Sequence, residues 1–310
     1  MGASAAISVR IDLSRIRQNL ADIRRLTGVP IIAVVKADAY GLGIERVLPV
    51  LADGVEGFCV FSVAEAAAAR IWERTGKPSL ALGPGAGEDA EEYLKHHVRP
   101  AAWDVGRAGA LRAAGPVLSV DTGMQRFACP AGQIEAVLEA GECREAFTHA
   151  TTLARVARLV ERVGHHELKL HAAGSSLLAE PEARLDAVRP GLALYAGAVR
   201  ASTRLVEERK SDGPVGYTGF AVARHGVILA GYSNGLRPGP CLINGRKSRV
   251  IEVGMQSAFV ETGGGDRVGD GVVLLGDGLS EMEVAGDWKV SPQEVLMRLC
   301  AGGMREYHAE

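Results

Sequence analysis

The sequence predicts an α/β protein: an N-terminal (β/α)8 TIM barrel followed by a smaller antiparallel β domain. Short apolar runs alternate with Ala-, Leu- and charge-rich helical stretches, which favours a parallel sheet with crossover helices. After residue 206 this alternation gives way to strand-like runs separated by Gly and Asn turns. The apolar runs lie at 30–37, 57–63, 78–83, 99–103, 116–121, 145–150, 168–173 and 187–195.

Polar side chains after the predicted strands favour the barrel over a doubly wound sheet, which would show the same alternation. Each lies at or just after the carboxyl end of a strand, the face on which barrel enzymes carry their active sites. These side chains are Lys36, Asp104, Asp121, His149 and Ser175.

Length and charge narrow the class of ligand. A chain of 310 residues with 47% hydrophobic residues can bury one large core and a second, smaller one. Its 35 basic and 37 acidic residues give a net charge of -2, so nothing favours nucleic acid or an anionic membrane. A small-molecule ligand is expected. The start of the chain shows no signal peptide and no run reaches transmembrane length, which predicts a cytoplasmic protein.

Cysteine and histidine spacing predicts neither a disulfide framework nor a metal site. The five cysteines are odd in number, scattered and without a CxxC pair. His96-His97 and His165-His166 are adjacent pairs, and neighbouring residues on a helix or strand do not face one ligand. The loop at 83–90 is rich in glycine but lacks the spacing of a phosphate-binding loop.

The chain begins with a predicted strand at 6–11 and a helix at 13–26, for which Asp12 is a suitable N-cap. The segment PIIAVVKADAYGLG at 30–43 then places Lys36 at the end of a buried strand. Desolvation there would lower the pKa of the amine and make it a nucleophile or base. A strand-end lysine that reaches solvent is the common alternative, but the polar turn containing Asp38 and Tyr40 favours the first interpretation.

The run VVKADAYGLG resembles the cofactor-lysine motif of alanine racemases, pyridoxal-phosphate (PLP) enzymes built from a (β/α)8 barrel and a C-terminal β domain. The resemblance implies that Lys36 carries PLP covalently and that Tyr40 belongs to the cofactor-binding set.

A second motif, DTGMQR at 121–126, is similar to a racemase signature whose arginine reaches the cofactor's phenolic oxygen and the substrate carboxylate. Arg126 takes that role by resemblance, and a guanidinium binds carboxylate with two parallel hydrogen bonds. An isolated arginine in such a loop would more often be a surface residue. Some members of the family have a lysine where this chain has Ser119.

Two further segments resemble cofactor contacts. FTH at 147–149 is similar to the family's FTHF segment, which implies that His149 supports the cofactor ring. HAAGSS at 171–176 is similar to the HxANS turn, which implies that Ser175 binds the phosphate, with Gly174 in place of the family's asparagine. On its own His149 would remain unassigned, because a lone histidine is more often a core residue.

The run VRPGLALY at 188–195 resembles the family's VRPGxxLYG signature. It implies that Arg189 faces the pyridine nitrogen and that the amides of Gly191 and Leu192 help to hold the phosphate. An arginine cannot give up its proton to the ring, so the pyridine stays neutral. That limits carbanion delocalisation and favours racemisation over decarboxylation or transamination.

The predicted β domain carries the remaining site residues. GYSNG at 231–235 resembles the family's GYADG motif, in which the tyrosine comes from the partner subunit and acts as the second base. Tyr232 would need cationic neighbours such as His149 and Arg126 for that role. Met255 matches a methionine whose backbone N–H holds the substrate carboxylate, although Gln256 replaces the family's aspartate.

The domains are predicted at 1–206 and 207–310, with 207–213 as a linker and residues 1–11 as a candidate to pair with the C-terminal domain. The expected strand-like runs in the second domain are 216–230, 249–262, 270–275 and 282–290. A capping box at 291–294 opens a helix to about residue 299. Gly302 departs from the tyrosine that the family commonly has near its C-terminus, and Tyr307 is a possible replacement.

These motifs predict a PLP-dependent amino-acid racemase, with alanine as the first candidate substrate and Lys36 and Tyr232 as the two bases of a homodimer. A non-catalytic PLP-binding protein is one alternative, but such carriers lack the β domain. A decarboxylase is disfavoured by Arg189. A degenerate racemase stays open because of Gly174, Gln256 and Gly302, as does a racemase of serine or a larger amino acid.

Overall fold

The computed structural model describes residues 6–85 and 87–309 of the chain. These residues fold into two compact units. One comprises Ile16–Ala39 and Gly43–Leu194, and the other comprises the chain up to Arg15, Tyr40–Leu42 and Tyr195 to the C-terminus. In the described parts of the chain, no helix combines the length and the apolar character needed to cross a membrane.

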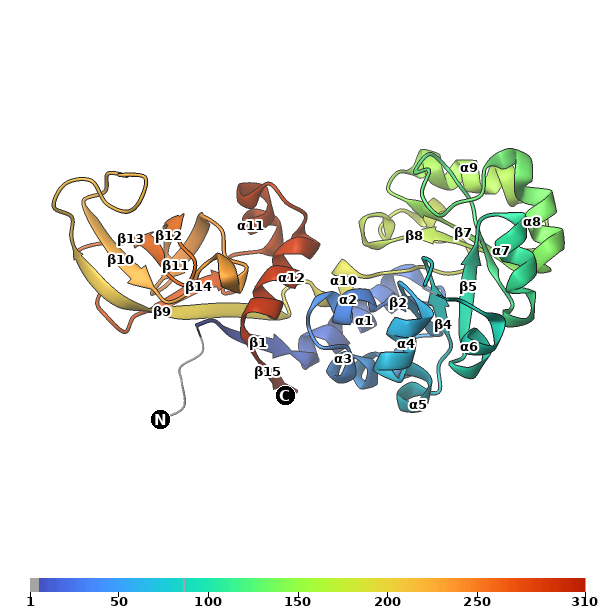
Figure 1. Cartoon of the computed structure of the whole chain (residues 1–310), viewed down its shortest axis with the longest axis horizontal. Helices are drawn as coiled ribbons and strands as arrows, with labels where there is room; N and C mark the ends of the chain where they lie inside the picture. Colours follow the sequence, from blue (N-terminus) through green and yellow to red (C-terminus); the bar gives the residue numbers. More distant parts are fainter. Residues whose placement is uncertain (1–5, 86, 310) are drawn as a thin grey trace. The chain divides into compact units, whose positions relative to one another are not determined.

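The first unit is a parallel β barrel. Its seven strands pair in sequence order, each hydrogen-bonded to the next (Figure 1). They are β2 (Ile32–Val34), β3 (Gly57–Val60), β4 (Ser79–Ala81), β5 (Val98–Ala102), β6 (Val117–Ser119), β7 (Glu145–Ala150) and β8 (Lys169–Ala173).

The segment 187–190 closes the ring between β8 and β2. The amide of Val188 donates to the Pro30 carbonyl at 3.0 Å, and the amide of Arg189 donates to the Ala173 carbonyl at 2.7 Å. This segment is too short to be a regular strand, but it makes the backbone hydrogen bonds expected of the eighth strand. The (β/α)8 prediction is confirmed.

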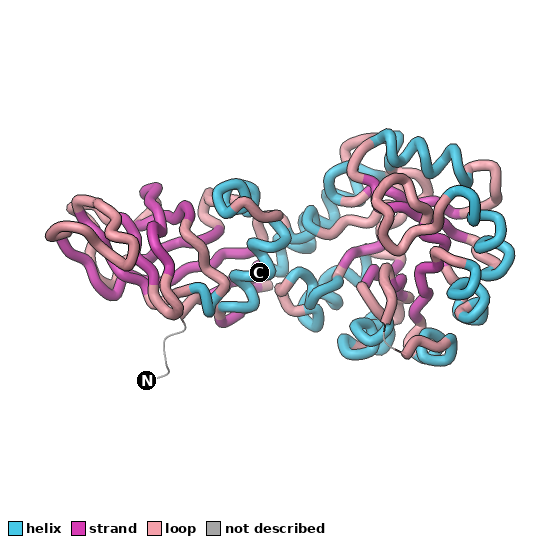
Figure 2. The backbone as a smooth tube through the Cα atoms, turned by 45° about the horizontal axis from the view of Figure 1, so that its top comes forward, coloured by secondary structure: helices cyan, strands magenta, loops and turns pink. Residues whose placement is uncertain are grey.

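Helices lie on the outer side of the barrel strands (Figure 2). Several begin at a residue that the sequence suits for capping: the side chains of Ser62, Asp89 and Asp104 each accept the N–H three residues further on. The helices are α1 (Leu13–Thr27), α3 (Ile44–Leu51), α4 (Val63–Ala69), α5 (Ile71–Thr75), α6 (Ala90–Lys95), α7 (Val105–Ala110), α8 (Ile134–Gly141), α9 (Leu153–Val163) and α10 (Leu192–Tyr195).

A buried polar cluster lies inside the barrel. Glu145 accepts hydrogen bonds from Nε2 of His171 at 2.7 Å and from Nη1 of Arg99 at 2.6 Å. Burial alone would raise the pKa of Glu145, but these hydrogen bonds and the Arg99 charge lower it to about 2. Burial of the His171 ring, which is 0% exposed, lowers its pKa to about 4. The barrel thus holds an ionised carboxylate and a neutral imidazole at pH 7.

The second unit contains an antiparallel sheet in the order β10-β13-β12-β11-β14-β9-β1-β15, in which only β1 and β15 pair in parallel. Strand β9 also pairs with β10, so six of the strands form a closed ring. The strands are β1 (Ser8–Asp12), β9 (Val199–Lys210), β10 (Arg224–Ile228), β11 (Gly239–Ile243), β12 (Arg246–Val253), β13 (Ala258–Glu261), β14 (Gly271–Leu275) and β15 (Met304–His308). This confirms the predicted β domain.

Some local predictions in this unit are wrong. The expected strand at 282–290 is the helix α11 (Glu281–Trp288), because Ser280 caps it and Val284, Ala285 and Trp288 are buried on one side. Strand β11 was not foreseen, since prolines interrupt its sequence. The expected linker at 207–213 is wrong in its first part, because residues 207–210 belong to β9 and pair with β10. The predicted helix start is confirmed: Ser291 is the N-cap of α12 (Pro292–Gly302), and its side chain accepts the amide of Glu294.

The pKa of His171 generates a testable pH dependence. The folded pKa of about 4 lies below the usual histidine pKa of 6.5, so between these pH values the unfolded chain binds a proton that the native chain does not. The free energy of unfolding should fall as pH drops through this interval, by on the order of 3 kcal/mol when the loss is complete. In urea unfolding of PLP-loaded protein at pH 7.5 and 4.5, His171→Asn should show a shallower decline than the native chain. Equal declines would refute this assignment.

Candidate active site

Positive charges gather at the carboxyl ends of the barrel strands. Lys36 follows β2, is half-buried, and lies close enough to Arg126 and Arg189 for their charges to act on it. Burial lowers the pKa of Lys36, the two guanidinium groups lower it further, and Glu65 partly opposes them. Lys36 therefore lies at the barrel mouth and has a lowered pKa, as the sequence predicts.

The backbone after Lys36 forms an unusual left-handed turn, α2 (Lys36–Tyr40). Four successive residues without glycine, 37–40, have φ angles of 55°, 56°, 52° and 60°. Each such residue costs about 1–2 kcal/mol, so the surrounding structure has to hold the turn in place. The amide of Ala39 donates to the Val35 carbonyl at 2.9 Å, and Oδ1 of Asp38 accepts the amide of Ile44 at 2.8 Å.

Glu65, on helix α4, is a residue that the sequence interpretation missed. Its Oε1 accepts the backbone N–H of Ala37, and its Oε2 accepts that of Phe61 at 2.6 Å. One carboxylate therefore joins the residue after Lys36 to the end of β3. Ser62 and Glu65 have the sequence spacing of a capping box, and Oγ of Ser62 accepts the amide of Glu65. That spacing would predict a hydrogen bond from the Ser62 amide to the Glu65 carboxylate, so it does not point to Ala37.

Asp121 shapes the loop that carries Arg126. Its Oδ1 accepts the amides of Gly123, Met124 and Gln125 at 2.8–3.0 Å, and these bonds lower the pKa of Asp121. Arg126 follows as an exposed side chain. Its guanidinium is therefore open to a ligand carboxylate while its backbone is fixed.

Arg189 lies inside the mouth and is only 6% exposed. Its guanidinium stacks over the Phe147 ring at 4.6 Å, and Nη2 donates to the Thr148 carbonyl. Its Nε is buried and has no hydrogen-bond partner among the described residues. A buried donor without an acceptor is costly, so this N–H fits an unprotonated ring nitrogen such as that of PLP.

Ser175 lies where two backbone amides converge. Its Oγ accepts the N–H of Gly191 at 3.1 Å and that of Ala193 at 3.0 Å, at the start of α10. Leu192, the first residue of α10, is half-buried beside them. A hydroxyl and neighbouring amides are a donor set that suits phosphate oxygens.

Positive charges act on His149 at the end of β7. Partial desolvation and the charges of Arg189, Lys36 and Arg126 lower its pKa to about 4. The lowered pKa disfavours the cationic form of the His149 ring that was expected beside a phenol.

In the second unit, Tyr232 and Met255 lie on two turns that are hydrogen-bonded together. The amide of Tyr232 donates to the Gly254 carbonyl at 2.9 Å, and that of Ser233 donates to the Met255 carbonyl at 3.1 Å. The two side chains are 57% and 61% exposed, respectively. A Cβ on Gly231 would lie 2.2 Å from the Met255 carbonyl oxygen, so close packing of the turns requires glycine there.

The same unit explains the changed C-terminus. A Cβ on Gly302 would lie 2.0 Å from the Asn234 carbonyl oxygen, which excludes a tyrosine at this position. Tyr307, on β15, instead donates its hydroxyl to the Leu42 carbonyl at 2.9 Å. Tyr40 packs its ring against Tyr195, with centroids 5.1 Å apart.

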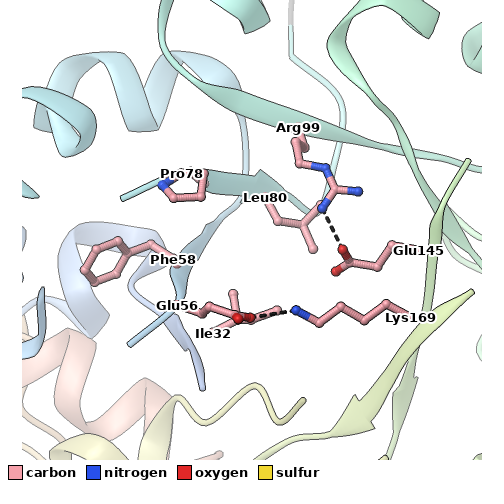
Figure 3. Close-up of a pocket in the computed structure, with 10 residues that line it drawn as sticks. Ile32, Glu56, Phe58, Pro78, Leu80, Arg99, Glu145 and Lys169 are labelled. Carbon is pink, nitrogen blue, oxygen red and sulfur yellow. Dashed lines mark hydrogen bonds and ion pairs between the residues drawn. The ribbon is translucent and has the colours of Figure 1, made fainter. Parts of the chain in front are cut away.

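A cavity of about 230 Å³ opens at the opposite, amino ends of the barrel strands (Figure 3). Its charges are already paired: Arg99 with Glu145 at 2.6 Å and Lys169 with Glu56 at 2.6 Å. Residues at this end of a barrel typically support stability, and none of the predicted site residues lines this cavity.

Comparison with known proteins agrees with this geometry. The family model for the N-terminal domain of alanine racemase matches residues 11–199. The biosynthetic alanine racemase of Escherichia coli strain K12 is 30% identical, over 97% of this chain and 99% of its own. The crystal structure of the Pseudomonas aeruginosa biosynthetic alanine racemase has a TM-score of 0.87 and 26% identity, covering 97% of this chain and 99% of its own.

The alanine racemase of Bartonella henselae, solved with covalently bound pyridoxal phosphate, shares the fold with a TM-score of 0.85 and 22% identity, covering 99% of this chain and 100% of its own. A barrel with a lysine at its mouth, followed by a β domain, is the architecture of a PLP-binding barrel protein. The chain belongs to the alanine racemase family.

Removal of the Glu65 charge should lower the pKa of Lys36 further. Glu65→Gln deletes an anion that favours the ammonium form. Its amide oxygen can accept one of the two backbone N–H groups, whereas its NH2 group cannot accept the other. After removal of PLP with hydroxylamine, the pH midpoint for reattachment, followed by visible absorbance, should shift down by about 0.5–1 unit.

Glu73→Gln is the matched control, since Glu73 is an exposed carboxylate on the neighbouring helix α5. Its midpoint should equal that of the native chain. An unchanged or raised midpoint in Glu65→Gln would contradict the role given to this carboxylate.

Proposed function

We propose that the chain is a PLP-dependent alanine racemase. The observation that carries the proposal is the unpaired, buried Nε of Arg189, which lies in the same barrel mouth as a lysine of lowered pKa and the Ser175 donor set. An arginine at the ring nitrogen favours reversible proton transfer over the chemistry of a protonated ring. Membership of the alanine racemase family supports the same activity.

Each residue of the mouth has a separate task in this proposal. Lys36 binds PLP through its amine, Ser175, Gly191 and Leu192 hold the phosphate, and Tyr40 and His149 contact the cofactor. When bound, PLP delocalises the electron pair left at Cα after the proton has been removed. The low pKa of Lys36 raises the fraction of neutral amine, which can take that proton on one face of Cα.

The second face requires a second base, for which we propose Tyr232 of a partner subunit. Tyr232 and Met255 are exposed side by side on two joined turns, so one docking event would deliver both. The Met255 backbone and Arg126 would then hold the substrate carboxylate. The proposed assembly is a homodimer located in the cytoplasm.

A larger amino acid is the second candidate substrate, favoured by aromatic side chains near the mouth. Phe127, which follows Arg126, has its ring centroid 6.2 Å from that of Phe61 and 5.3 Å from that of Trp103. Phe61 is 44% exposed and Phe127 is 36% exposed. Exposed apolar groups beside a carboxylate-binding arginine suit a substrate with more apolar surface than a methyl group.

Proton exchange in D2O tests the activity. Purified protein with PLP should deuterate Cα of L-alanine and form D-alanine in parallel, because the returned proton comes from a residue that exchanges with solvent. Lys36→Ala should abolish both signals. Tyr232→Phe should reduce inversion by at least about 100-fold, within the range by which a positioned acid–base group accelerates proton transfer.

L-serine, L-leucine and L-phenylalanine should be compared in the same assay. Faster inversion of the larger substrates would identify them as the preferred class. Stable PLP attachment without deuteration of any of these amino acids would replace the racemase with a non-catalytic PLP-binding protein.

Subunit complementation tests the shared site. Lys36→Ala and Tyr232→Phe protein, each nearly inactive alone, should regain activity when their subunits are exchanged by mild dissociation and mixing. One site of each hybrid dimer would then contain both native bases, so about a quarter of native activity is expected when half of the dimers are hybrids. No recovery, with exchange verified by a mass label, would place both bases in one chain.

A further inference from the structure

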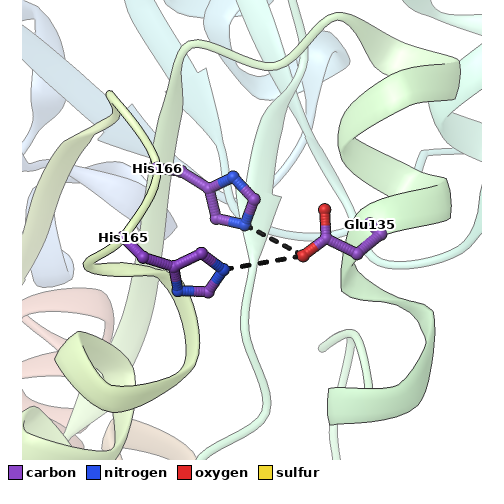
Figure 4. Close-up of side chains that lie close together, drawn as sticks. All are labelled: Glu135, His165 and His166. Carbon is purple, nitrogen blue, oxygen red and sulfur yellow. Dashed lines mark hydrogen bonds and ion pairs between the residues drawn. The ribbon is translucent and has the colours of Figure 1, made fainter.

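Three side chains, one on helix α8 and two in the turn before strand β8, converge on one point (Figure 4). Glu135 lies in the first turn of α8, and His165 and His166 lie in the turn between α9 and β8. Oε1 of Glu135 is 3.1 Å from Nε2 of His166 and 3.7 Å from Nε2 of His165. One ligand atom from each residue fits within 4.8 Å of the others.

The convergence contradicts the expectation that adjacent histidines do not face one ligand. That rule holds on helices and strands, whereas these residues lie in a tight turn. The amide of Gly164 donates to the Val160 carbonyl at 2.7 Å and that of His166 to the Val163 carbonyl at 3.0 Å. A Cβ on Gly164 would lie 2.5 Å from the Val160 oxygen, so the turn depends on glycine. The two rings consequently lie 4.1 Å apart on the same side.

We propose that Glu135, His165 and His166 bind a divalent first-row transition metal ion of the zinc class. Zinc binds imidazole nitrogen and carboxylate oxygen at about 2.0–2.2 Å, so adjacent ligands of a tetrahedral ion are separated by about 3.3–3.5 Å. The two distances to Glu135 already bracket this separation. Magnesium and calcium are the wrong class, because they require mainly oxygen ligands in greater number.

The surroundings allow an ion to enter and leave one coordination position for water. The side chains of Glu135, His165 and His166 are 75%, 62% and 23% exposed. The bound ion would tie helix α8 to the turn that follows α9. The ion would bind the native chain, in which the three side chains converge, and not the unfolded chain. It would therefore raise the stability of this outer face.

The chain contains a matched control in its other adjacent pair. Nε2 of His96 is 3.1 Å from a carboxylate oxygen of Glu92, the same distance as in the proposed site. His97 does not join them, because its ring stacks on Trp72 with centroids 3.6 Å apart. A hydrogen-bonded His–Glu pair is thus present without the third ligand.

Equilibrium dialysis of PLP-loaded protein against ZnCl2 tests the site, together with the visible spectrum of the protein titrated with CoCl2. The native chain and His96→Asn should bind the same number of zinc ions, with a tetrahedral cobalt spectrum. The double variant His165→Asn/His166→Asn should lose one equivalent. Loss of a hydrogen-bond partner of a metal ligand weakens metal affinity by about 10-fold to 100-fold. Glu135→Gln removes a ligand itself, so it should weaken zinc affinity by more than this.

Thermal unfolding gives an independent measurement. Added ZnCl2 should raise the melting midpoint of the native chain and of His96→Asn by equal amounts, and that of the double variant by less. The proposal fails if the native chain binds no zinc at micromolar concentration. It also fails if the double variant binds as many equivalents, with the same affinity, as the native chain.

Discussion

Closure of the barrel through residues 187–190 is the constraint on which the proposed site depends. The backbone bonds of Val188 and Arg189 complete the ring between β8 and β2. The same short segment carries the Arg189 side chain inward and delivers the amides of Gly191 and Ala193 to Ser175. A shift of this segment would therefore move the ring-nitrogen donor and the phosphate donors together, whereas a loop outside the barrel could move without changing either.

Closure also brings positive charges close together at the barrel mouth. Lowered pKa values and nearby carboxylates offset this charge. Arg189 is buried without an ion pair in the described structure, so its charge is opposed at a distance by Glu145. Lys36 and His149 respond by having lowered pKa values. The arginines keep their charge, which anion binding requires. The lysine and the histidine are easier to deprotonate, which proton transfer requires.

The sequence predicted the barrel because buried parallel strands are continuous apolar runs, and it placed Lys36 and Ser175 at the ends of such runs. Arg189 lies within the last run and was assigned from the resemblance of VRPGLALY to a family signature. It did not reveal Glu65 as a support for the lysine turn, since that role depends on two backbone amides from different strands. The helix α11 was mistaken for a strand because its alternation of apolar and polar residues fits either period over eight residues. The lowered pKa of His149 could not be foreseen because it depends on partial desolvation and on charges brought together from separate segments of the chain.

The two adjacent histidine pairs show why spacing alone does not decide a site. Both pairs precede a strand of the barrel, and both contain one ring paired with a carboxylate at 3.1 Å. They differ in the backbone: the Gly164 turn directs both rings to Glu135, whereas His97 has a φ of 52° and its ring turns to Trp72. The Gly164 turn therefore provides three ligands, whereas the His96-His97 pair provides two, His96 and Glu92. Metal-binding capacity at such a pair is therefore a property of backbone geometry, in the same way that the left-handed turn after Lys36 determines where its amine is presented.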